Sequence, residues 1–274
     1  MTRWMQFQLF CRSFFLQTGW NFAKYQNLGL AFVMTPFLRK LYKQDKQDLP
    51  SILERYLEVF NTQPTMASFC FGALARQEER MAQAKTLADF RERLSEWNNL
   101  KRSLSITTAS LGDRLFWGTL KPFTLVLSIF VWLALDINFF EIAPKENISY
   151  QEVFGACIVA FFAFNAVSLF VKWKGISLSY YAPNNGCFGL TQFDWNRTIY
   201  NTKRFGILLA ICLLVGGLYY FLHDLNTFTG LAFITRAIIV FFFVSISFLP
   251  RDLRIPNMYL YIAAMLVFNI VYLF

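Results

Sequence analysis

The sequence offers few side chains whose types and spacing suit catalysis. His223, the only histidine, stands beside Asp224, where a solvated or capping role competes with one as a general base. The five cysteines form no C-x-x-C pair, which argues against a disulfide framework and a zinc site. The sequence contains no glycine-rich phosphate loop and no Ser-His-Asp set. We therefore expect no catalytic residue, no metal, no cofactor and no enzymatic activity of this chain by itself.

A polar turn indicates a different chemistry, the binding of an uncharged polyol. Asn61, Thr62 and Gln63 precede Pro64 and separate two short apolar stretches. Amide side chains donate and accept hydrogen bonds without a fixed charge, which suits a ligand rich in hydroxyl groups. Asp113 is a second candidate, just before another apolar stretch. It either caps the helix that follows or lines the path of a solute.

The apolar composition indicates what holds these residues in place. The chain of 274 residues is 56% hydrophobic and contains 33 Phe, more apolar surface than one soluble core of this size buries. Several stretches approach the roughly 20 residues that span a bilayer as a helix. We expect an all-α, polytopic membrane protein with about five transmembrane helices, at 115–136, 151–171, 205–222, 230–249 and 256–274.

Charges between these stretches predict the topology. The loop 136–150 is mostly acidic, whereas 172–204 and 250–255 are basic. Because cytoplasmic loops carry the excess of Lys and Arg, we place the first loop outside, the other two inside and the C-terminus outside. The same flanking pattern explains the net charge of +9, so we expect no nucleic-acid partner.

The first 110 residues are amphipathic rather than continuously apolar, so we divide the chain into a region 1–110 and a transmembrane bundle 111–274. The apolar residues recur at helical spacing, opposite Arg3, Gln6 and Ser13, and they are Trp4, Phe7, Phe10 or Cys11, and Phe14. This spacing predicts a helix that lies in the membrane interface, with a core-facing helix as the alternative. Residues 28–38 are apolar but too short to span a bilayer, and Pro36 is expected to interrupt them.

The polar turn lies between two further predicted helices. One is expected from Ser51 to about Phe60, and a second apolar stretch runs from Met66 to Ala75. Two short helices broken at such a turn form a re-entrant hairpin, provided that the free backbone groups line a cavity or are buried in protein. Residues 87–100 then predict an amphipathic cytosolic helix that packs on its own region.

Charged residues within or beside the predicted spans are also candidate functional residues, because a charge in the membrane is costly unless it is paired or hydrated. Lys121 and Asp113 bracket the start of the first span. Arg236 falls near the middle of the fourth, where it either has a functional role or lies at the interface.

Several sequence blocks occur together, in this order: R-S-F-F-L-Q at 12–17, Y-Q-N-L-G at 25–29, P-F-L-R-K-L-Y at 36–42, F-N-T-Q-P at 60–64, and G-D, F-W and L-K-P at 112–122. Taken together, they resemble the IID membrane component of the mannose/fructose/sorbose-family sugar phosphotransferase systems. The resemblance is good over about residues 10–125 and weak beyond them.

The resemblance implies a permease subunit that conducts a hexose or related sugar across the bacterial cytoplasmic (inner) membrane with a IIC partner. Such pairs commonly assemble as a trimer. Separate IIA and IIB components phosphorylate the sugar, which agrees with the lack of a phosphoacceptor in this chain. The implied substrate-binding or pathway residues are Asn61, Thr62, Gln63, Glu78, Glu79, Asp113 and Lys121.

Two departures from the family pattern fall near these residues. The family usually has His where this chain has Gln63, and a Pro-Leu-Ala-Gly-Ile-Gly-Asp run where this chain reads Thr107 to Asp113. The loss of Pro and Gly should stiffen or reshape a turn there. Two alternatives stay open: a transporter that is independent of phosphotransfer, and a scaffold or receptor that binds IIC without moving sugar.

Overall fold

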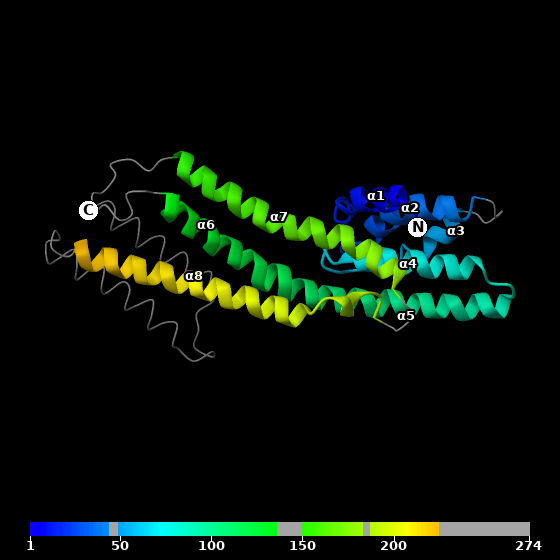
Figure 1. The fold of residues 1–274 in the computed structure, drawn as a ribbon. Coiled ribbons are helices and arrows are strands. Elements are labelled where there is room, and N and C mark those ends of the chain that lie inside the picture. The colour runs from blue at the N-terminus through cyan, green and yellow to red at the C-terminus, as the bar shows by residue number, and fades with distance from the viewer. Residues whose placement is uncertain (44–48, 136–149, 183–186, 225–274) are drawn as a thin grey trace. The chain divides into compact units, whose positions relative to one another are not determined.

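The computed structural model describes residues 1–43, 49–135, 150–182 and 187–224, which form an all-α protein (Figure 1). The predicted fold class is therefore confirmed. Contacts divide the chain into two compact units, Met1–Leu213 and Leu214–Phe274. Within the second unit only the end of one helix is described.

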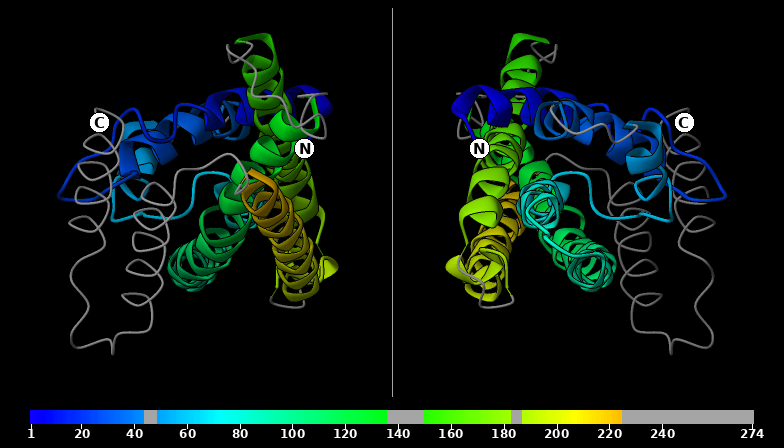
Figure 2. Two further views of the ribbon diagram at one scale, coloured as in Figure 1. Left: turned by 90° about the vertical axis from the view of Figure 1, so that its left-hand side faces the viewer. Right: turned by 90° about the vertical axis from the view of Figure 1, so that its right-hand side faces the viewer.

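Four short helices come first, namely α1 (Arg3–Ser13), α2 (Asn27–Leu41), α3 (Leu49–Glu54) and α4 (Ala67–Ala82). α1 and α2 lie side by side, as both views of Figure 2 show. The helix expected from Ser51 to about Phe60 is wrong in its extent, since α3 ends at Glu54. The chain leaves the helix there because Tyr56 bonds to α4 and the Phe60 amide donates to the Lys24 carbonyl.

Pro36 does not interrupt the second helix as predicted, because α2 continues through it. A proline has no N–H, so the carbonyl of Phe32, four residues earlier, loses its helical donor. The Arg12 guanidinium of α1 donates to that carbonyl at 2.8 Å and lies 4.4 Å from the centroid of the Phe32 ring. A neighbouring helix thus supplies the hydrogen bond that the proline removes.

The longest helix runs without a break through α5 (Leu87–Gly112), the π-helix η1 (Asp113–Leu120) and α6 (Lys121–Leu135). The expectation of a turn at 107–113 is therefore wrong. Asp113 does not cap a helix start either, because its own amide donates back to the carbonyls of Ala109 and Ser110. The amphipathic helix predicted for residues 87–100 is the first part of α5, and it packs against α4 as expected.

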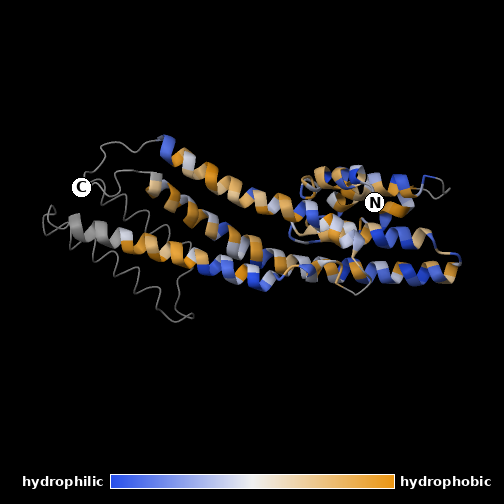
Figure 3. Ribbon diagram, in the orientation of Figure 1, coloured by the Kyte–Doolittle hydropathy of each residue, from blue (hydrophilic) through white to orange (hydrophobic). Residues whose placement is uncertain are grey.

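Two more long helices follow, α7 (Tyr150–Tyr181) and α8 (Trp195–Asp224), with the 3₁₀ turn η3 (Leu190–Gln192) between them. Three helices in the described part of the chain are long and apolar enough to cross a membrane, within 87–134, 150–181 and 195–216. They overlap the first three predicted spans, of which 151–171 lies wholly within its helix, and Figure 3 shows the apolar stretches of these helices. The spans predicted at 230–249 and 256–274, and Arg236, lie outside the described residues.

Two glycines allow α4 and α7 to approach closely. A Cβ at Gly72 would lie 2.2 Å from the carbonyl oxygen of Ile176, and one at Gly175 would lie 2.2 Å from the Ser68 hydroxyl. Small residues at a crossing let helix backbones come together, as at many helix interfaces in membranes. This crossing joins the short N-terminal helices to the long ones.

The aromatic face of α1 points away from the rest of the described chain. Met5, Gln6 and Leu9 are buried, whereas Trp4 and Phe7 are exposed. The Gln6 amide donates to the carbonyl of Trp173 in α7 at 2.9 Å. The core-facing alternative is therefore wrong for Trp4 and Phe7, and the side of α1 that packs on the protein is mixed, since it buries Met5 and Leu9 beside Gln6.

Candidate functional site

The polar turn 61–64 is part of an irregular segment that two neighbouring elements hold in place. The Gln26 side chain, just before α2, forms two hydrogen bonds with the backbone of Thr62: its amide donates to the carbonyl at 2.9 Å and its oxygen accepts from the amide at 3.0 Å. The backbone amide of Gln26 also donates to the Phe60 carbonyl at 2.8 Å. These bonds satisfy buried backbone groups that no helix or sheet pairs.

The Thr62 side chain bonds to α5 rather than facing a ligand. Its hydroxyl lies 2.7 Å from that of Thr108, and Thr108 donates to the carbonyl of Leu104 at 2.6 Å. Because the Thr108 proton goes to that carbonyl, the Thr62 hydroxyl is the donor between the two threonines. Thr62 therefore anchors the turn to the helix that faces it.

Gln63 stabilises the turn that leads into α4. Its side-chain oxygen accepts from the backbone amides of Thr65 at 2.7 Å and Met66 at 2.9 Å, the two residues that precede α4. These bonds satisfy backbone donors in a segment without regular secondary structure. A Cβ at Gly112 would lie 2.4 Å from the Gln63 Cβ, so α5 touches the turn closely at the residue before Asp113.

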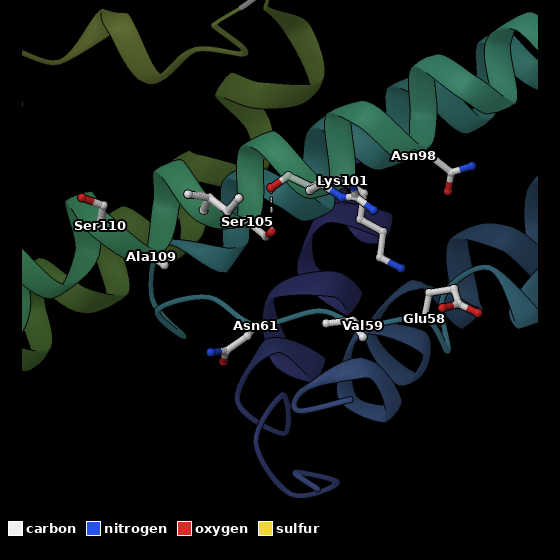
Figure 4. A pocket seen from close by; sticks show the side chains of 10 residues that line it. Glu58, Val59, Asn61, Asn98, Lys101, Ser105, Ala109 and Ser110 are labelled. Atoms are coloured by element: carbon white, nitrogen blue, oxygen red, sulfur yellow. Dashed lines mark hydrogen bonds between the residues drawn. The ribbon is translucent and has the colours of Figure 1, made fainter. Parts of the chain in front are cut away.

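Asn61 differs from its two neighbours because it is exposed and lines a groove between the turn and α5. The groove has a volume of about 1040 Å³, and seven of its ten lining residues carry an amide, hydroxyl or charged group. Figure 4 shows the Lys101 side chain extending from α5 toward the segment that carries Glu58 and Asn61. The other polar residues of the lining are Asn98, Arg102, Ser105 and Ser110.

Lys101 closes one side of this groove while remaining mostly buried. Only 5% of the residue is exposed, and its ammonium donates to the Arg55 carbonyl at 2.9 Å. It also lies 5.4 Å from the centroid of the Trp97 ring. A carbonyl and an aromatic face thus hold the ammonium in place at the edge of the groove.

Glu78 is fully buried and lies at the centre of a cluster of polar side chains. Its carboxylate accepts from Arg55 at 2.6 Å, from Tyr42 at 2.9 Å and from Tyr56 at 2.7 Å. Burial raises the pKa of Glu78, and the guanidinium and the two hydroxyls act against that rise. With three donors already bound, this carboxylate fastens the segment after α3 to α4.

Glu79, the next residue, has a separate set of partners. One oxygen accepts from the Tyr180 hydroxyl of α7, and the other accepts from Arg76 at 3.3 Å. Its carboxylate therefore joins α4 to α7. The structure does not bring Glu79 to the groove that Asn61 lines.

Asp113 and Lys121 stand at the two ends of the π-helical stretch, and both are exposed. The Lys121 ammonium lies 4.5 Å from the centroid of the Trp117 ring, and both residues line a groove of about 450 Å³. The structure thus brings Asn61, Thr62 and Gln63 against α5 near Asp113, and it places Glu78, Glu79 and Lys121 elsewhere.

Three contributors to this site were not expected from the sequence, namely Gln26, Thr108 and Lys101. Gln26 falls within the Y-Q-N-L-G block, so the block itself was a signal. Thr108 lies in the run where the turn was expected, and nothing in its neighbours shows that it meets Thr62. Within the described residues, no group of three His, Cys, Asp or Glu side chains could hold a metal ion.

Comparison with known proteins identifies the family. The model of the "PTS system mannose/fructose/sorbose family IID component" matches residues 1–218, which is most of the chain. The chain belongs to this IID family. The resemblance in the N-terminal blocks is thereby confirmed, and so is the membrane character of the protein.

Curated IID components are similar over the N-terminal part. The mannose-specific EIID component of Escherichia coli (strain K12) is 31% identical over 172 residues, covering 63% of this chain and 53% of the relative. The sorbose-specific EIID component of Klebsiella pneumoniae is 33% identical over 172 residues, covering 63% and 54%. The fructose permease IID component of Bacillus subtilis (strain 168) is 33% identical over 174 residues, covering 64% and 55%. This chain thus spans about half the length of these IID relatives.

Two solved structures have a similar fold. A chain of the complex of mannose transporter ManYZ with microcin E492 aligns with a TM-score of 0.52 and 26% identity, covering 78% of this IID chain and 70% of that chain. A second, titled only as a membrane protein, aligns with a TM-score of 0.57 and 24% identity, covering 77% and 70%. The second similarity concerns the fold alone.

Proposed function

We propose that this chain is a sugar-translocating IID subunit of a mannose-family phosphotransferase system. It moves a hexose or related sugar with a IIC partner, and IIA and IIB components phosphorylate the sugar at the cytoplasmic face. Membership of the IID family supports this proposal. The observation that carries it is the groove at Asn61, where amide and hydroxyl side chains line a space large enough for a sugar.

Within the proposal, the candidate residues divide into two roles. Asn61 and Asp113 are exposed and available to a solute, and Lys121 lies farther along the same helix. The Thr62 hydroxyl, the Gln63 side-chain oxygen and the Glu78 carboxylate are bonded within the protein, so these residues hold the segment in place. Glu79 ties the hairpin to α7.

The proposed setting is the bacterial inner membrane, which the chain crosses several times, with the region 1–110 at the cytoplasmic side. The basic loop after α7 and the acidic loop before it support this orientation. A trimer of IIC–IID pairs is the proposed assembly. Modification of single engineered cysteines from either side of the membrane would test the orientation.

The direct test is uptake of labelled hexoses and amino sugars by cells that lack their own mannose-type permease. The cells receive this chain with its IIC partner, with IIA and IIB present or withheld. Accumulation of sugar phosphate only with all components supports the proposal. Uptake without IIA and IIB would show a transporter independent of phosphotransfer, and a stable complex without any uptake would show a scaffold.

The groove is tested by a matched pair of asparagines on α5. Asn98 lines the groove and its neighbour Asn99 does not, although both are exposed. Loss of one or two hydrogen bonds to a sugar at Asn61→Ala or Asn98→Ala should lower uptake roughly tenfold. Asn99→Ala should leave uptake unchanged, with equal amounts of each variant in the membrane. Equal effects of Asn98→Ala and Asn99→Ala on uptake would show that the groove is not part of the sugar path.

A further inference from the structure

The N-terminal helices carry an exposed aromatic surface that nothing in the described chain covers. Phe22 is 89% exposed and Trp4 is 65% exposed, both far from the burial expected of such side chains. The residues of this aromatic surface are Trp4, Phe7, Phe14, Phe15, Trp20, Phe22, Tyr25, Leu28 and Phe32. Contiguous exposed apolar surface of this kind marks a site of interaction.

Ring contacts link neighbouring members of the aromatic surface across three elements. Trp4 stacks on Phe7 within α1, with centroids 5.7 Å apart. Phe15 meets Phe32 of α2 at 6.1 Å, and Trp20 meets Phe22 at 4.8 Å in the turn between the two helices. The aromatic surface therefore draws residues from α1, α2 and their connection, and the Phe15–Phe32 contact joins the connection to α2.

The turn that carries Trp20 and Phe22 is held in a fixed shape. The Asn21 side chain accepts from the Lys24 amide at 2.8 Å and donates to the Asn27 side chain at 2.9 Å. Tyr25 has φ +60°, a left-handed conformation that is uncommon for a residue other than glycine. Such a conformation persists only where the surrounding structure imposes it, and here it keeps two aromatic rings at the tip of the turn.

The charge of this part of the sequence is entirely positive. Residues 1–44 contain no Asp or Glu, and their cations are Arg3, Arg12, Lys24, Arg39, Lys40 and Lys43. Cations beside exposed Trp and Phe are typical of segments that lie on anionic membrane surfaces. A protein partner that covered this surface would have to be both apolar and acidic.

The position of α1 along α7 agrees with a location at the membrane surface. Phe10 packs on Trp173 with centroids 5.4 Å apart, and the Lys172 ammonium lies 4.2 Å from the centroid of the Phe14 ring. These α7 residues directly follow 151–171, the second span predicted from the sequence. α1 thus meets the long helix where the apolar stretch ends and the basic loop begins.

We propose that the aromatic surface is an interfacial anchor that inserts into the cytoplasmic leaflet and prefers anionic lipids. The anchor is also connected to the groove, because the turn between α1 and α2 forms hydrogen bonds with the segment 57–64, which carries Asn61. Phe60 donates to the Lys24 carbonyl at 3.3 Å, and Asn27 donates to the Leu57 carbonyl at 2.8 Å. The anchor therefore fixes the segment 57–64 relative to the bilayer surface. It requires a membrane location but not sugar transport.

The test replaces Phe22 with the photocrosslinking amino acid p-benzoylphenylalanine, which keeps an aromatic side chain at the tip. The full chain with its IIC partner is placed in nanodiscs of equal parts phosphatidylglycerol and phosphatidylcholine, irradiated and analysed by mass spectrometry. We expect lipid adducts at position 22, with phosphatidylglycerol exceeding phosphatidylcholine by about fivefold, the factor for one Lys or Arg near an anionic surface.

The control places the same amino acid at Leu87, which is 66% exposed at the start of α5 and predicted to lie in the cytosol. Position 87 should give no lipid adducts. Adducts of position 22 to a protein subunit, or no adducts, would overturn the anchor. Equal labelling of the two lipids would overturn its preference for anionic lipids. None of these readouts depends on sugar uptake, so the anchor and the proposed function fail independently.

Discussion

The segment around α4 and the long helices α6 to α8 bury their side chains in different ways. Around α4, buried polar groups meet specific partners, as in the cluster of Glu78 with Arg55, Tyr42 and Tyr56. In α7 and α8, only 11% of the most apolar window is buried within the chain. The first region therefore specifies its own packing, whereas the second exposes surface that a bilayer or a partner subunit must cover.

The largest effect on stability is predicted for removal of the Glu78 charge, at the centre of the region around α4. Glu78→Gln keeps the shape of the side chain but leaves Arg55 without its anion. Breaking a buried ion pair in this way should cost about 3–5 kcal/mol in the free energy of unfolding. Urea unfolding of the purified chain in detergent micelles, followed by circular dichroism, measures this change.

Glu79→Gln is the matched control, because Glu79 is the adjacent carboxylate and its side chain is 24% exposed. Its more solvated ion pair with Arg76 should contribute only about 1 kcal/mol or less. Similar losses for the two variants would contradict the view that buried pairing specifies the first region.

An intermediate effect is expected where the two regions meet, at the crossing of α4 and α7. Gly72→Ala places a methyl group against the backbone of Ile176, so the helices must separate. Overpacking of this kind typically costs about 1–3 kcal/mol. The same urea unfolding experiment applies.

Gly118→Ala provides the comparison within the long helix, where the new Cβ would lie 3.5 Å from the Asp113 carbonyl oxygen, its one near neighbour among the described residues. Replacing an unconstrained helical glycine should stabilise by about 0.5–1 kcal/mol. If both glycine variants destabilised equally, close approach at the crossing would not be the reason for Gly72.

The smallest predicted effect concerns the hydrogen bond that replaces the one lost at Pro36. Arg12→Gln should destabilise by about 1 kcal/mol, the net contribution of an ordinary hydrogen bond. In a Pro36→Ala background the Phe32 carbonyl has a helical donor again, so the same substitution should cost less. A double-mutant cycle in urea measures the difference, and identical costs in both backgrounds would contradict this role for Arg12.

Periodicity and length predicted the long apolar helices well, because each is a local property of the sequence. The breaks were harder to predict. Pro36 was expected to end a helix, but its missing hydrogen bond is supplied by Arg12, which is 24 residues earlier in the chain. The turn at 107–113 was expected from family comparison, but Thr108 and its neighbours continue as helix.

The candidate site was only partly predictable for the same reason. The chemistry of Asn61, Thr62 and Gln63 can be read from the residue types, but which of them is free depends on distant partners. Thr62 bonds to Thr108, and Gln63 bonds to the turn that leads into α4, so of these three residues Asn61 alone lines the groove. Glu78 did carry a local signal, since a carboxylate that follows an apolar stretch at helical spacing requires a buried donor.

The π-helical stretch η1 affects which changes of chain length this protein tolerates. A π-helix contains one more residue than an α-helix of equal extent needs, and here the Lys121 backbone amide donates to the Phe116 carbonyl five residues earlier. Deletion of one residue within 113–120 would therefore restore α-helical geometry and leave the faces of α6 unchanged. The same deletion in α5 would rotate α6 by about 100° against α7. Insertions and deletions in this family are thus expected to concentrate at η1.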